Sequence, residues 1–372
     1  MSESENKGSR SGAPSRLWLI KLIALGLSSL VALVFVEVAI RLVSPQPVSW
    51  YPIYQEHPRL PMYSLMPNVK HHVLTGETDW TIETDANGYR FSGAPDPAPR
   101  CRALWLGDSF LFGHGVDYGL SVIGRVDAAT PGMHHFNTGV PGYGPVQYRQ
   151  VLEDALAQGL PFDRIYLMSF LGNDFHDTQW EKDVVVKDGI LGNRGGLDSF
   201  LKRNLHLRRL LANVYHRLAP QENVTFDKIA NDLATPAVWD EPFLKKSASI
   251  YEKEMHRILE IAREHRLPIH GIVIPTLSSV AAFNADQPTA SAESESIRAE
   301  ATAAGRDLTL PVEKATAIFD RVGMTYLDAA PILSQQPMEK VFFRFDGHLS
   351  ELGNELVADA FMAAAGSGCG PR

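Results

Sequence analysis

Cysteine and excess positive charge are both scarce in this chain, and each scarcity excludes a class of protein. Two cysteines, Cys101 and Cys369, are too few for a disulfide framework and are not spaced like zinc ligands. A formal net charge of -8 argues against nucleic-acid binding, because phosphate recognition needs clustered lysine and arginine. The remaining composition is ordinary, with 45% hydrophobic and 21% charged residues over 372 positions, and is sufficient for one large domain or two small ones.

One long apolar run does occur, at residues 22–40, and Glu37 is its only charged residue. A helix needs roughly 20 apolar residues to cross the hydrocarbon core of a membrane. Arg41 alone closely follows the run, whereas four basic residues precede it: Lys7, Arg10, Arg16 and Lys21. This asymmetry predicts a single-pass anchor whose short N-terminus stays in the cytoplasm while the rest of the chain is exported.

A cleaved signal peptide is the main alternative to an anchor. The run exceeds a usual signal-peptide apolar region, and residues 41–50 lack a small-x-small cleavage site. A buried core helix is the weaker alternative, because a soluble helix normally keeps a polar face. The uncleaved anchor is therefore the preferred interpretation.

The chain is expected to divide into four parts. They are a cytoplasmic tail at residues 1–16, a transmembrane signal anchor at 17–43, a linker with a lead-in hairpin at 44–100, and a folded domain at 101–372. The third part is rich in proline and turn residues. Its strand-like stretch, residues 78–85, precedes the turn signal Asn87-Gly88.

Short apolar runs alternate with helical patterns in the folded domain. The runs lie at residues 103–107, 134–139, 164–170, 269–275 and 325–328, and the helices at 146–157, 245–265, 311–322 and after 350. Buried parallel strands have this appearance. The order predicts an α/β fold, a three-layer doubly wound (flavodoxin-like) and mostly parallel five-stranded sheet, with functional groups at the carboxyl ends of its strands.

Two segments interrupt the alternation, a cap-like helical insertion at residues 175–244 and an Ala/Ser/Glu-rich stretch at 276–310. Both are expected to project from the carboxyl edge of the sheet, where they could shape a cleft. Within the first, residues 202–218 place leucines at helical spacing with arginines largely elsewhere on the wheel. We interpret this as a solvated cap helix; the alternative is a surface that rests on anionic lipid headgroups, through Arg208 and Arg209.

The strand at residues 104–106 leads directly into Gly107-Asp108-Ser109, so it delivers the serine hydroxyl into a tight turn. Acyl transfer needs such a nucleophile, a base that takes its proton, and donors for the developing oxyanion. Asp346 and His348 lie just before the last helix, where the imidazole could act as base and the carboxylate could orient it. The three letters GDS alone are a weak signal, because an N-cap or turn serine looks the same.

Together with two further blocks, these residues resemble the SGNH (GDSL-like) hydrolase superfamily. FNTGVPGYGPVQ follows the second strand and matches the family's asparagine-plus-glycine turn, while LGND, residues 171–174, follows the third. NGYRF, residues 87–91, resembles bacterial members with an N-terminal anchor. The resemblance implies a catalytic set of Ser109, His348 and Asp346, and an oxyanion hole made by the backbone amides of Ser109 and Gly142 and the side chain of Asn173.

The sequence departs from the family pattern at two places. Leu171 replaces the first glycine of the GxND block, which changes the turn more than the chemistry. Asp346 stands two residues before His348, where Asp-x-x-His is usual. The shorter spacing resembles branches that act on extracellular polysaccharides.

The resemblance implies a serine esterase that hydrolyses an O-acyl ester, with acetyl favoured, of an envelope glycan or a small molecule. An O-acetyltransferase with the same residues, and a non-catalytic glycan-binding or scaffold module, are the alternatives. Neither a cofactor nor a metal is expected, and the expected partners are the envelope ester and the membrane, with no nucleic acid. The implied location is the bacterial inner membrane, with the catalytic domain on its extracytoplasmic side.

Two smaller features complete the sequence. The adjacent pairs His71-His72 and His134-His135 are poor metal sites, because neighbours on a strand point to opposite faces. Cys101 begins the first strand and Cys369 follows the last helix, so in an oxidising compartment they could form a disulfide. Two unpaired thiols are the alternative.

Overall fold

The structure is a computed structural model that describes residues 16–43, 51–74, 77–91, 98–178, 184–187, 189–192, 205–208, 210–211, 214, 241–285, 287–288, 290–344 and 346–365. The chain forms two compact units, one of residues 1–47 and 195–219 and the other of residues 48–194 and 220–372. Most of the predicted insertion at 175–244 lies outside the described residues, as do residues 1–15 of the predicted tail at 1–16 and Cys369.

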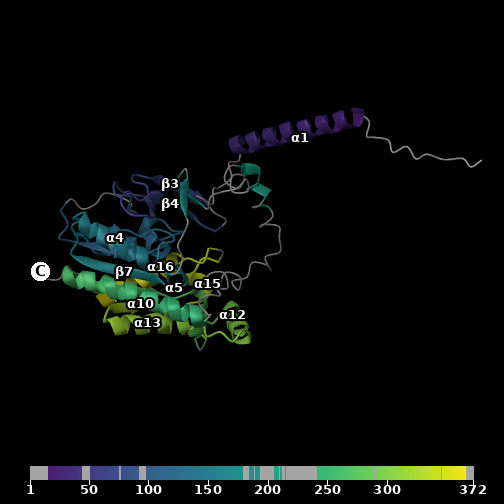
Figure 1. The fold of residues 1–372 in the computed structure, drawn as a ribbon. Coiled ribbons are helices and arrows are strands. Elements are labelled where there is room, and N and C mark those ends of the chain that lie inside the picture. Colours follow the sequence, from purple (N-terminus) through teal and green to yellow (C-terminus); the bar gives the residue numbers. More distant parts are fainter. Residues whose placement is uncertain are drawn as a thin grey trace, which may run out of the picture. The chain divides into compact units, whose positions relative to one another are not determined.

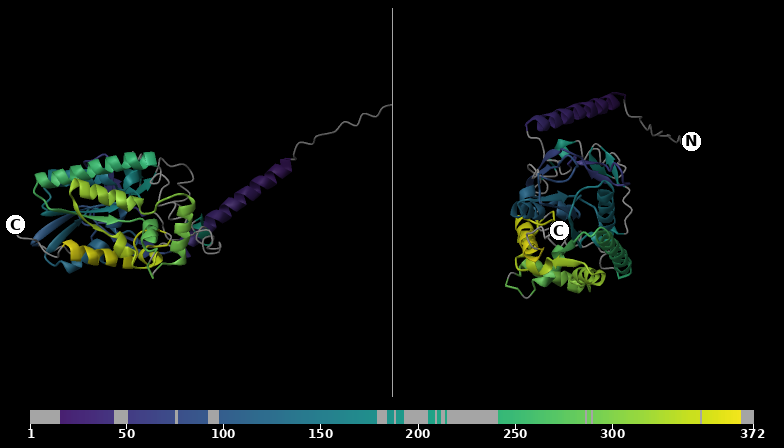
Figure 2. Two further views of the ribbon diagram at one scale, coloured as in Figure 1. Left: turned by 90° about the horizontal axis from the view of Figure 1, so that it is seen from below. Right: turned by 90° about the vertical axis from the view of Figure 1, so that its left-hand side faces the viewer.

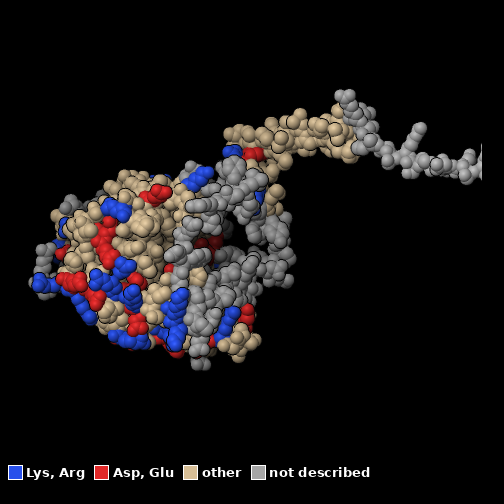
Figure 3. Space-filling view, in the orientation of Figure 1, with Lys and Arg blue, Asp and Glu red and all other residues tan. Residues whose placement is uncertain are grey.

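The first unit contains one long apolar helix, α1 (Arg16–Val43). Its segment Trp18–Val43 has a mean hydropathy of 2.5 and no buried residues in its most apolar window, and it is long enough to cross a membrane. Figure 3 shows the helix almost without charged side chains along its length. The predicted apolar helix is thus present, and it suits a signal anchor or a signal peptide.

Glu37, the acidic residue within α1, has partners inside the same unit. It accepts the backbone N–H groups of His206 at 3.0 Å and Leu207 at 2.8 Å, and pairs with Arg41 at 2.7 Å. The described part of the predicted amphipathic helix is helical at 206–208, 210–211 and 214. A carboxylate in an otherwise apolar helix needs such partners to offset the cost of its desolvation.

The second unit is built on a five-stranded parallel sheet. Its strands are β5 (Cys101–Leu106), β6 (Met133–Asn137), β7 (Arg164–Phe170), β10 (Ile269–Ile274) and β11 (Thr325–Asp328). They lie in the order β11-β10-β7-β5-β6, and every pairing is parallel. In chain order this is 2-1-3-4-5, the flavodoxin-like arrangement, so the predicted fold class is confirmed.

Helices cover both faces of this sheet. They are α3 (Val122–Ala129), α4 (Pro145–Ala157), α10 (Glu241–Glu264), α11 (Leu277–Phe283), α12 (Ala292–Ala303), α13 (Leu310–Val322), α14 (Ala330–Leu333), α15 (Met338–Val341) and α16 (Glu351–Ala365), with short turns α2 (Ser109–Phe112), η1 (Tyr118–Leu120) and α5 (Asp174–Asp177). The predicted helices at 146–157, 245–265 and 311–322 correspond to α4, α10 and α13. The stretch at 276–310 contains two helices, α11 and α12.

The strands alternate between two cores because successive side chains point to opposite faces. Leu104 and Leu106 pack in one cluster with residues of α4, α10 and α13. Ala103 and Trp105 pack in the other with residues of α3, α11 and α16. Figure 1 shows α10 beside α13, and the left view of Figure 2 shows the yellow α16 across the sheet from the green α10.

The segment before β5 packs against the first of these cores. It contains the antiparallel pairs β1 (Tyr54–Glu56) with β2 (Tyr63–Leu65) and β3 (Lys70–Leu74) with β4 (Asp79–Glu83), and later β8 (Val185–Lys187) pairs with β9 (Ile190–Gly192). Ile53, Trp80 and Ile82 are buried in the cluster that holds Leu104. The predicted turn at Asn87-Gly88 is present, with φ of 81° at Gly88.

Cys101, at the start of β5, is disulfide-bonded. Cys369 is the only other cysteine in the sequence, and it lies outside the described residues.

Candidate active site

Ser109 is presented by a tight turn at the carboxyl end of β5. Asp108 caps α2, its Oδ1 accepting the backbone N–H of Phe110 at 2.9 Å. Gly107 is required here, because a Cβ at this position would lie 2.6 Å from the Leu111 Cβ and 2.9 Å from the Met168 carbonyl oxygen. The half-buried Ser109 therefore sits where strand and helix meet, at the edge of the sheet.

His348 and Asp346 lie on the loop between α15 and α16. The backbone N–H of Phe343 donates to the His348 carbonyl at 2.8 Å, and the N–H of Gly347 donates to the Phe343 carbonyl at 3.0 Å. Gly347 has a φ of 79°, a left-handed conformation that favours glycine. Ser350 Oγ accepts the Gly353 N–H at 3.2 Å, so it caps α16.

The loop brings both side chains to Ser109. His348 Nε2 lies 2.7 Å from Ser109 Oγ, and His348 Nδ1 is hydrogen-bonded to Asp346 Oδ1. Although only one residue separates Asp346 from His348, the Asp346 carboxylate thus contacts the imidazole nitrogen that does not face Ser109. A hydroxyl, an imidazole and a carboxylate in this sequence of contacts can activate the hydroxyl as a nucleophile.

Asp346 and His348 each stabilise the charged form of the other. Burial lowers the pKa of His348, but the charge and hydrogen bond of Asp346 outweigh burial, so the net pKa is raised. Burial raises the pKa of the Asp346 carboxyl, yet the nearby imidazoles of His348 and His114 hold it far below its usual range. Asp346 is therefore ionised, and it favours a protonated His348, the species that forms when the serine gives up its proton.

Asn173 follows β7, which pairs with β5, so the two strands end at the same edge of the sheet. Its Nδ2 donates to Asp177 Oδ2 at 3.0 Å. Burial raises the pKa of Asp108 to about 6, and the Asn173 side chain is among the groups that lower it. The amide is therefore close to the residue that precedes Ser109, with one N–H engaged by Asp177.

Gly142 lies in the loop that follows β6, the other neighbour of β5. Its φ is 84°, a left-handed conformation that glycine adopts without strain. The structure therefore puts all five predicted site residues at the carboxyl edge, Ser109 at the start of α2 and the others on loops, and it joins Ser109, His348 and Asp346 by direct contacts.

A buried carboxyl behind the Asn173 turn was not predicted. Asp174 accepts the hydroxyl of Tyr148 at 2.8 Å through Oδ1, and the hydroxyl of Ser169 through Oδ2. Burial raises the pKa of Asp174 well above its usual value. These contacts fix the turn that carries Asn173, and the only sequence signal for them is the Asn-Asp pair itself.

Arg90 was also missed, although it lies in the lead-in motif at residues 87–91. The guanidinium is completely buried and donates to the backbone carbonyls of Phe112, Gly113 and Val116. It also stacks on the rings of Trp80 and Phe112, at 5.0 and 4.7 Å. Arg90 therefore holds the segment that follows α2, which carries His114.

His114 is the third residue that sequence reasoning missed. Its Nε2 lies 3.3 Å from Asp346 Oδ2, the oxygen that does not contact His348. Within the described residues, His114, Asp346 and His348 are the group whose ligand atoms, all within 4.8 Å of one another, could hold a metal ion.

The histidines of the two adjacent pairs have other partners. His135 is a core residue held by Trp105 and Thr130, and the exposed His72 pairs with Asp79.

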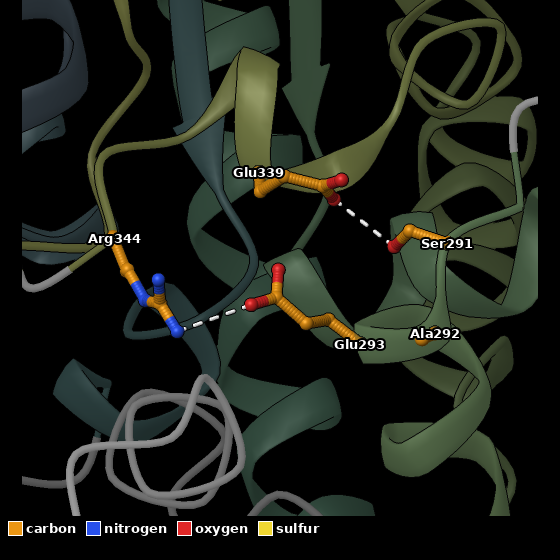
Figure 4. Close-up of a pocket in the computed structure, with 5 residues that line it drawn as sticks. All are labelled: Ser291, Ala292, Glu293, Glu339 and Arg344. Atoms are coloured by element: carbon orange, nitrogen blue, oxygen red, sulfur yellow. Dashed lines mark hydrogen bonds and ion pairs between the residues drawn. The ribbon is translucent and has the colours of Figure 1, made fainter. Parts of the chain in front are cut away.

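A pocket of about 510 Å³ lies beside the loop between α15 and α16. It is lined by Ser291, Ala292, Glu293, Glu339 and Arg344. Figure 4 shows the Arg344 guanidinium directed at Glu293, an ion pair of 3.1 Å, and Ser291 donating to Glu339 at 3.0 Å. Arg344 is two residues from Asp346, so this pocket borders the segment that carries the imidazole and its carboxylate.

No protein-family model matches the chain, and no curated protein is similar to it in sequence. Its structural neighbours are lipolytic proteins of the GDSL family and acetylxylan esterases. A GDSL-family protein from Veillonella parvula is 14% identical, covers 70% of this chain and 96% of its own, and superposes with a TM-score of 0.37. An acetylxylan esterase from Geobacillus stearothermophilus is 12% identical over 72% of this chain and 95% of its own, also with a TM-score of 0.37.

Both neighbours are distant from this chain in sequence. Their low identities and TM-scores leave the chemistry of this chain to be inferred from its own residues.

Proposed function

We propose that this chain is a serine esterase of the SGNH type, with Ser109 as nucleophile, His348 as general base and Asp346 as the group that orients it. The observation that carries the proposal is the 2.7 Å contact between Ser109 Oγ and His348 Nε2, with Asp346 on the opposite nitrogen. A core or turn serine has no need of a base whose other nitrogen is held by an ionised carboxylate.

The reaction follows from these contacts. Ser109 Oγ bonds to the ester carbonyl carbon while its proton moves to His348 Nε2, and the carbonyl π electrons move onto oxygen. When the tetrahedral intermediate collapses, the bond to the leaving alcohol breaks and His348 returns the proton to that oxygen. Water then repeats the sequence on the acyl-serine, with its proton taken by His348, and releases the acid and free Ser109.

The oxyanion is assigned to the backbone N–H groups of Ser109 and Gly142 and to the Asn173 amide. One N–H of that amide is donated to Asp177, and the proposal assigns the second to the oxyanion. Donors held in place before the reaction stabilise the transition state more than mobile water does.

The favoured substrate is an O-acetyl ester of an envelope carbohydrate. The pocket beside the catalytic loop is lined by carboxylates, a guanidinium and a hydroxyl, which suit a polar alcohol component better than a long lipid chain. The apolar α1 supports the proposal that the chain is held in the bacterial inner membrane with its catalytic unit on the extracytoplasmic side.

Hydrolysis assays of the full-length protein in detergent test this function. Wild type is expected to release acetate from aryl acetates and acetylated sugars, whereas Ser109→Ala does not. Ser121→Ala, which removes a buried serine hydroxyl that caps α3, is the matched control. Transfer of acetate to an added glycan, without free acetate, would indicate a transferase, and equal turnover by Ser109→Ala would reject the proposal.

A further inference from the structure

A second imidazole lies against the candidate catalytic pair. His114 stacks on His348, with ring centroids 4.4 Å apart and an interplanar angle of 25°. It comes from the segment after α2, five residues past Ser109, and its side chain is only 18% exposed. Two stacked imidazoles, those of His114 and His348, therefore lie beside the single carboxylate of Asp346.

Both ring nitrogens of His114 have polar partners. Nδ1 lies 2.9 Å from the hydroxyl of Tyr51, and Nε2 lies 3.3 Å from Asp346 Oδ2. Asp346 thus receives one imidazole on each oxygen, His348 on Oδ1 and His114 on Oδ2. A histidine that only filled space in this aromatic surrounding would need neither contact.

The protonation states around His114 fix its tautomer. Burial raises the pKa of Tyr51, so its hydroxyl keeps its proton and can donate to Nδ1. Burial and the adjacent His348 lower the pKa of His114, against the attraction of Asp346. A neutral ring that accepts at Nδ1 carries its hydrogen on Nε2, which faces Asp346.

Three further described residues lie near this ring or near Asp346. The ring of Trp80 packs against that of His114, with centroids 5.2 Å apart. The charge of Arg90 also lowers the pKa of His114. Glu77 lies on the loop side of Asp346, where its Oε2 accepts the Asp346 backbone N–H at 3.1 Å. The carboxylate is therefore held from its backbone by Glu77 and from its outer oxygen by His114.

We propose that His114 is a positioning residue for the esterase reaction, whose neutral imidazole, set in its tautomer by Tyr51, donates to the outer oxygen of Asp346. The role rests on the proposed function. In the Asp-x-His spacing, the carboxylate sits on the same short loop as the base. A contact from outside that loop is therefore needed to fix the carboxylate, and His114 provides one. With Oδ2 fixed, Oδ1 stays on His348 Nδ1 throughout the proton transfers.

Two amide substitutions separate this role from simple packing. A glutamine at position 114 carries its amide nitrogen near the place of Nε2, within reach of Asp346. An asparagine reaches only as far as Nδ1, toward Tyr51. Because a hydrogen bond to a charged group contributes about 1.5–3 kcal/mol, His114→Asn should lower kcat about 10- to 100-fold, and His114→Gln less than about 3-fold.

The assay uses full-length protein in detergent with an aryl acetate as substrate. KM should change less than about 2-fold in either variant, because His114 touches Asp346 and not the ester. In an Asp346→Asn background, His114→Asn should add less than about 2-fold, because the carboxylate that it positions is absent. Tyr51→Phe removes the hydroxyl that selects the tautomer of His114, and it should lower kcat several-fold. This variant replaces His114→Asn in the test if His114→Asn does not fold.

Equal kcat values for His114→Asn and His114→Gln would overturn the proposal, and so would a full His114→Asn effect in the Asp346→Asn background. Labelling of wild type by a fluorophosphonate distinguishes a failure of the His114 proposal from a failure of the esterase proposal. A wild type that labels and turns over, with His114→Asn unimpaired, contradicts the role of His114 alone. A wild type that neither labels nor turns over contradicts the esterase proposal and, with it, the role of His114.

Discussion

Ser109 Oγ and His348 Nε2 lie 2.7 Å apart although 239 residues separate them in the chain. The contact exists because β5 ends in the Gly107-Asp108 turn at the same edge of the sheet as the loop between α15 and α16. This hydrogen bond distinguishes a proton-transfer pair from two unrelated polar residues. Its consequences can be measured in several independent ways.

The dependence of kcat/KM on pH should follow His348. The base must be neutral to accept the Ser109 proton, and Asp346 raises the pKa of the imidazole. Activity is therefore expected to be lost as the pH falls, with a midpoint above the ordinary histidine value of about 6.5. Asp346→Asn should move this midpoint to lower pH and reduce kcat by up to about 10⁴-fold. A pH profile of the two proteins measures both effects, and a midpoint that stays in place would contradict the assignment of Asp346.

Asn173→Ala should slow turnover without unfolding the domain. Loss of one oxyanion donor raises the barrier by about 2.7–4 kcal/mol, which corresponds to roughly 100-fold or more in kcat. The control is Asn87→Ala, in the exposed turn at residues 85–88, which should leave kcat unchanged. If kcat of Asn173→Ala equals that of wild type, the amide serves only to bind Asp177.

Arg90→Met should reduce the free energy of unfolding. The substitution removes the guanidinium donor from three backbone carbonyls, at a cost of at least about 3 kcal/mol. Arg100→Met removes an exposed arginine whose guanidinium donates to the Pro131 carbonyl, and it should cost less than about 1 kcal/mol. Chemical denaturation of both variants measures the difference, and similar midpoints would show that Arg90 is dispensable.

The proposed anchor predicts how the protein fractionates. Because α1 has a mean hydropathy of 2.5 over a membrane-spanning length, the intact chain should stay in the membrane pellet after alkaline carbonate extraction. An N-terminal sequence that begins after residue 43, in a soluble mature protein, would instead indicate a cleaved signal peptide. Introducing two further charges, Leu30→Lys and Leu33→Lys, should release the chain from the pellet.

The sheet could be predicted from the sequence because its strands are short apolar runs separated by helical patterns. The runs at 164–170 and 325–328 match β7 and β11 to the residue. The run at 134–139 extends two residues past β6, since the Asn137 side chain already turns back to accept the Gly139 N–H. Such ends depend on local hydrogen bonds that periodicity does not reveal.

The candidate site was predictable only where a motif marks it. Ser109, Asp346 and His348 stand in recognisable blocks, and the structure joins them. His114 and the partners of Asp174 act through tertiary contacts, with no periodic pattern and no characteristic spacing. The NGYRF motif marks Arg90 but does not reveal the backbone carbonyls that it binds. The donation of Asn173 to Asp177 likewise depends on the orientation of an amide within a short turn.

The most direct measurement is the mass of the full-length protein after treatment with a fluorophosphonate. If Ser109 and His348 act as nucleophile and base, wild type should gain one phosphonyl group on the peptide that contains Ser109, and His348→Gln should react at least about 100-fold more slowly. Equal labelling rates for wild type and His348→Gln, or modification at another serine, would contradict the account.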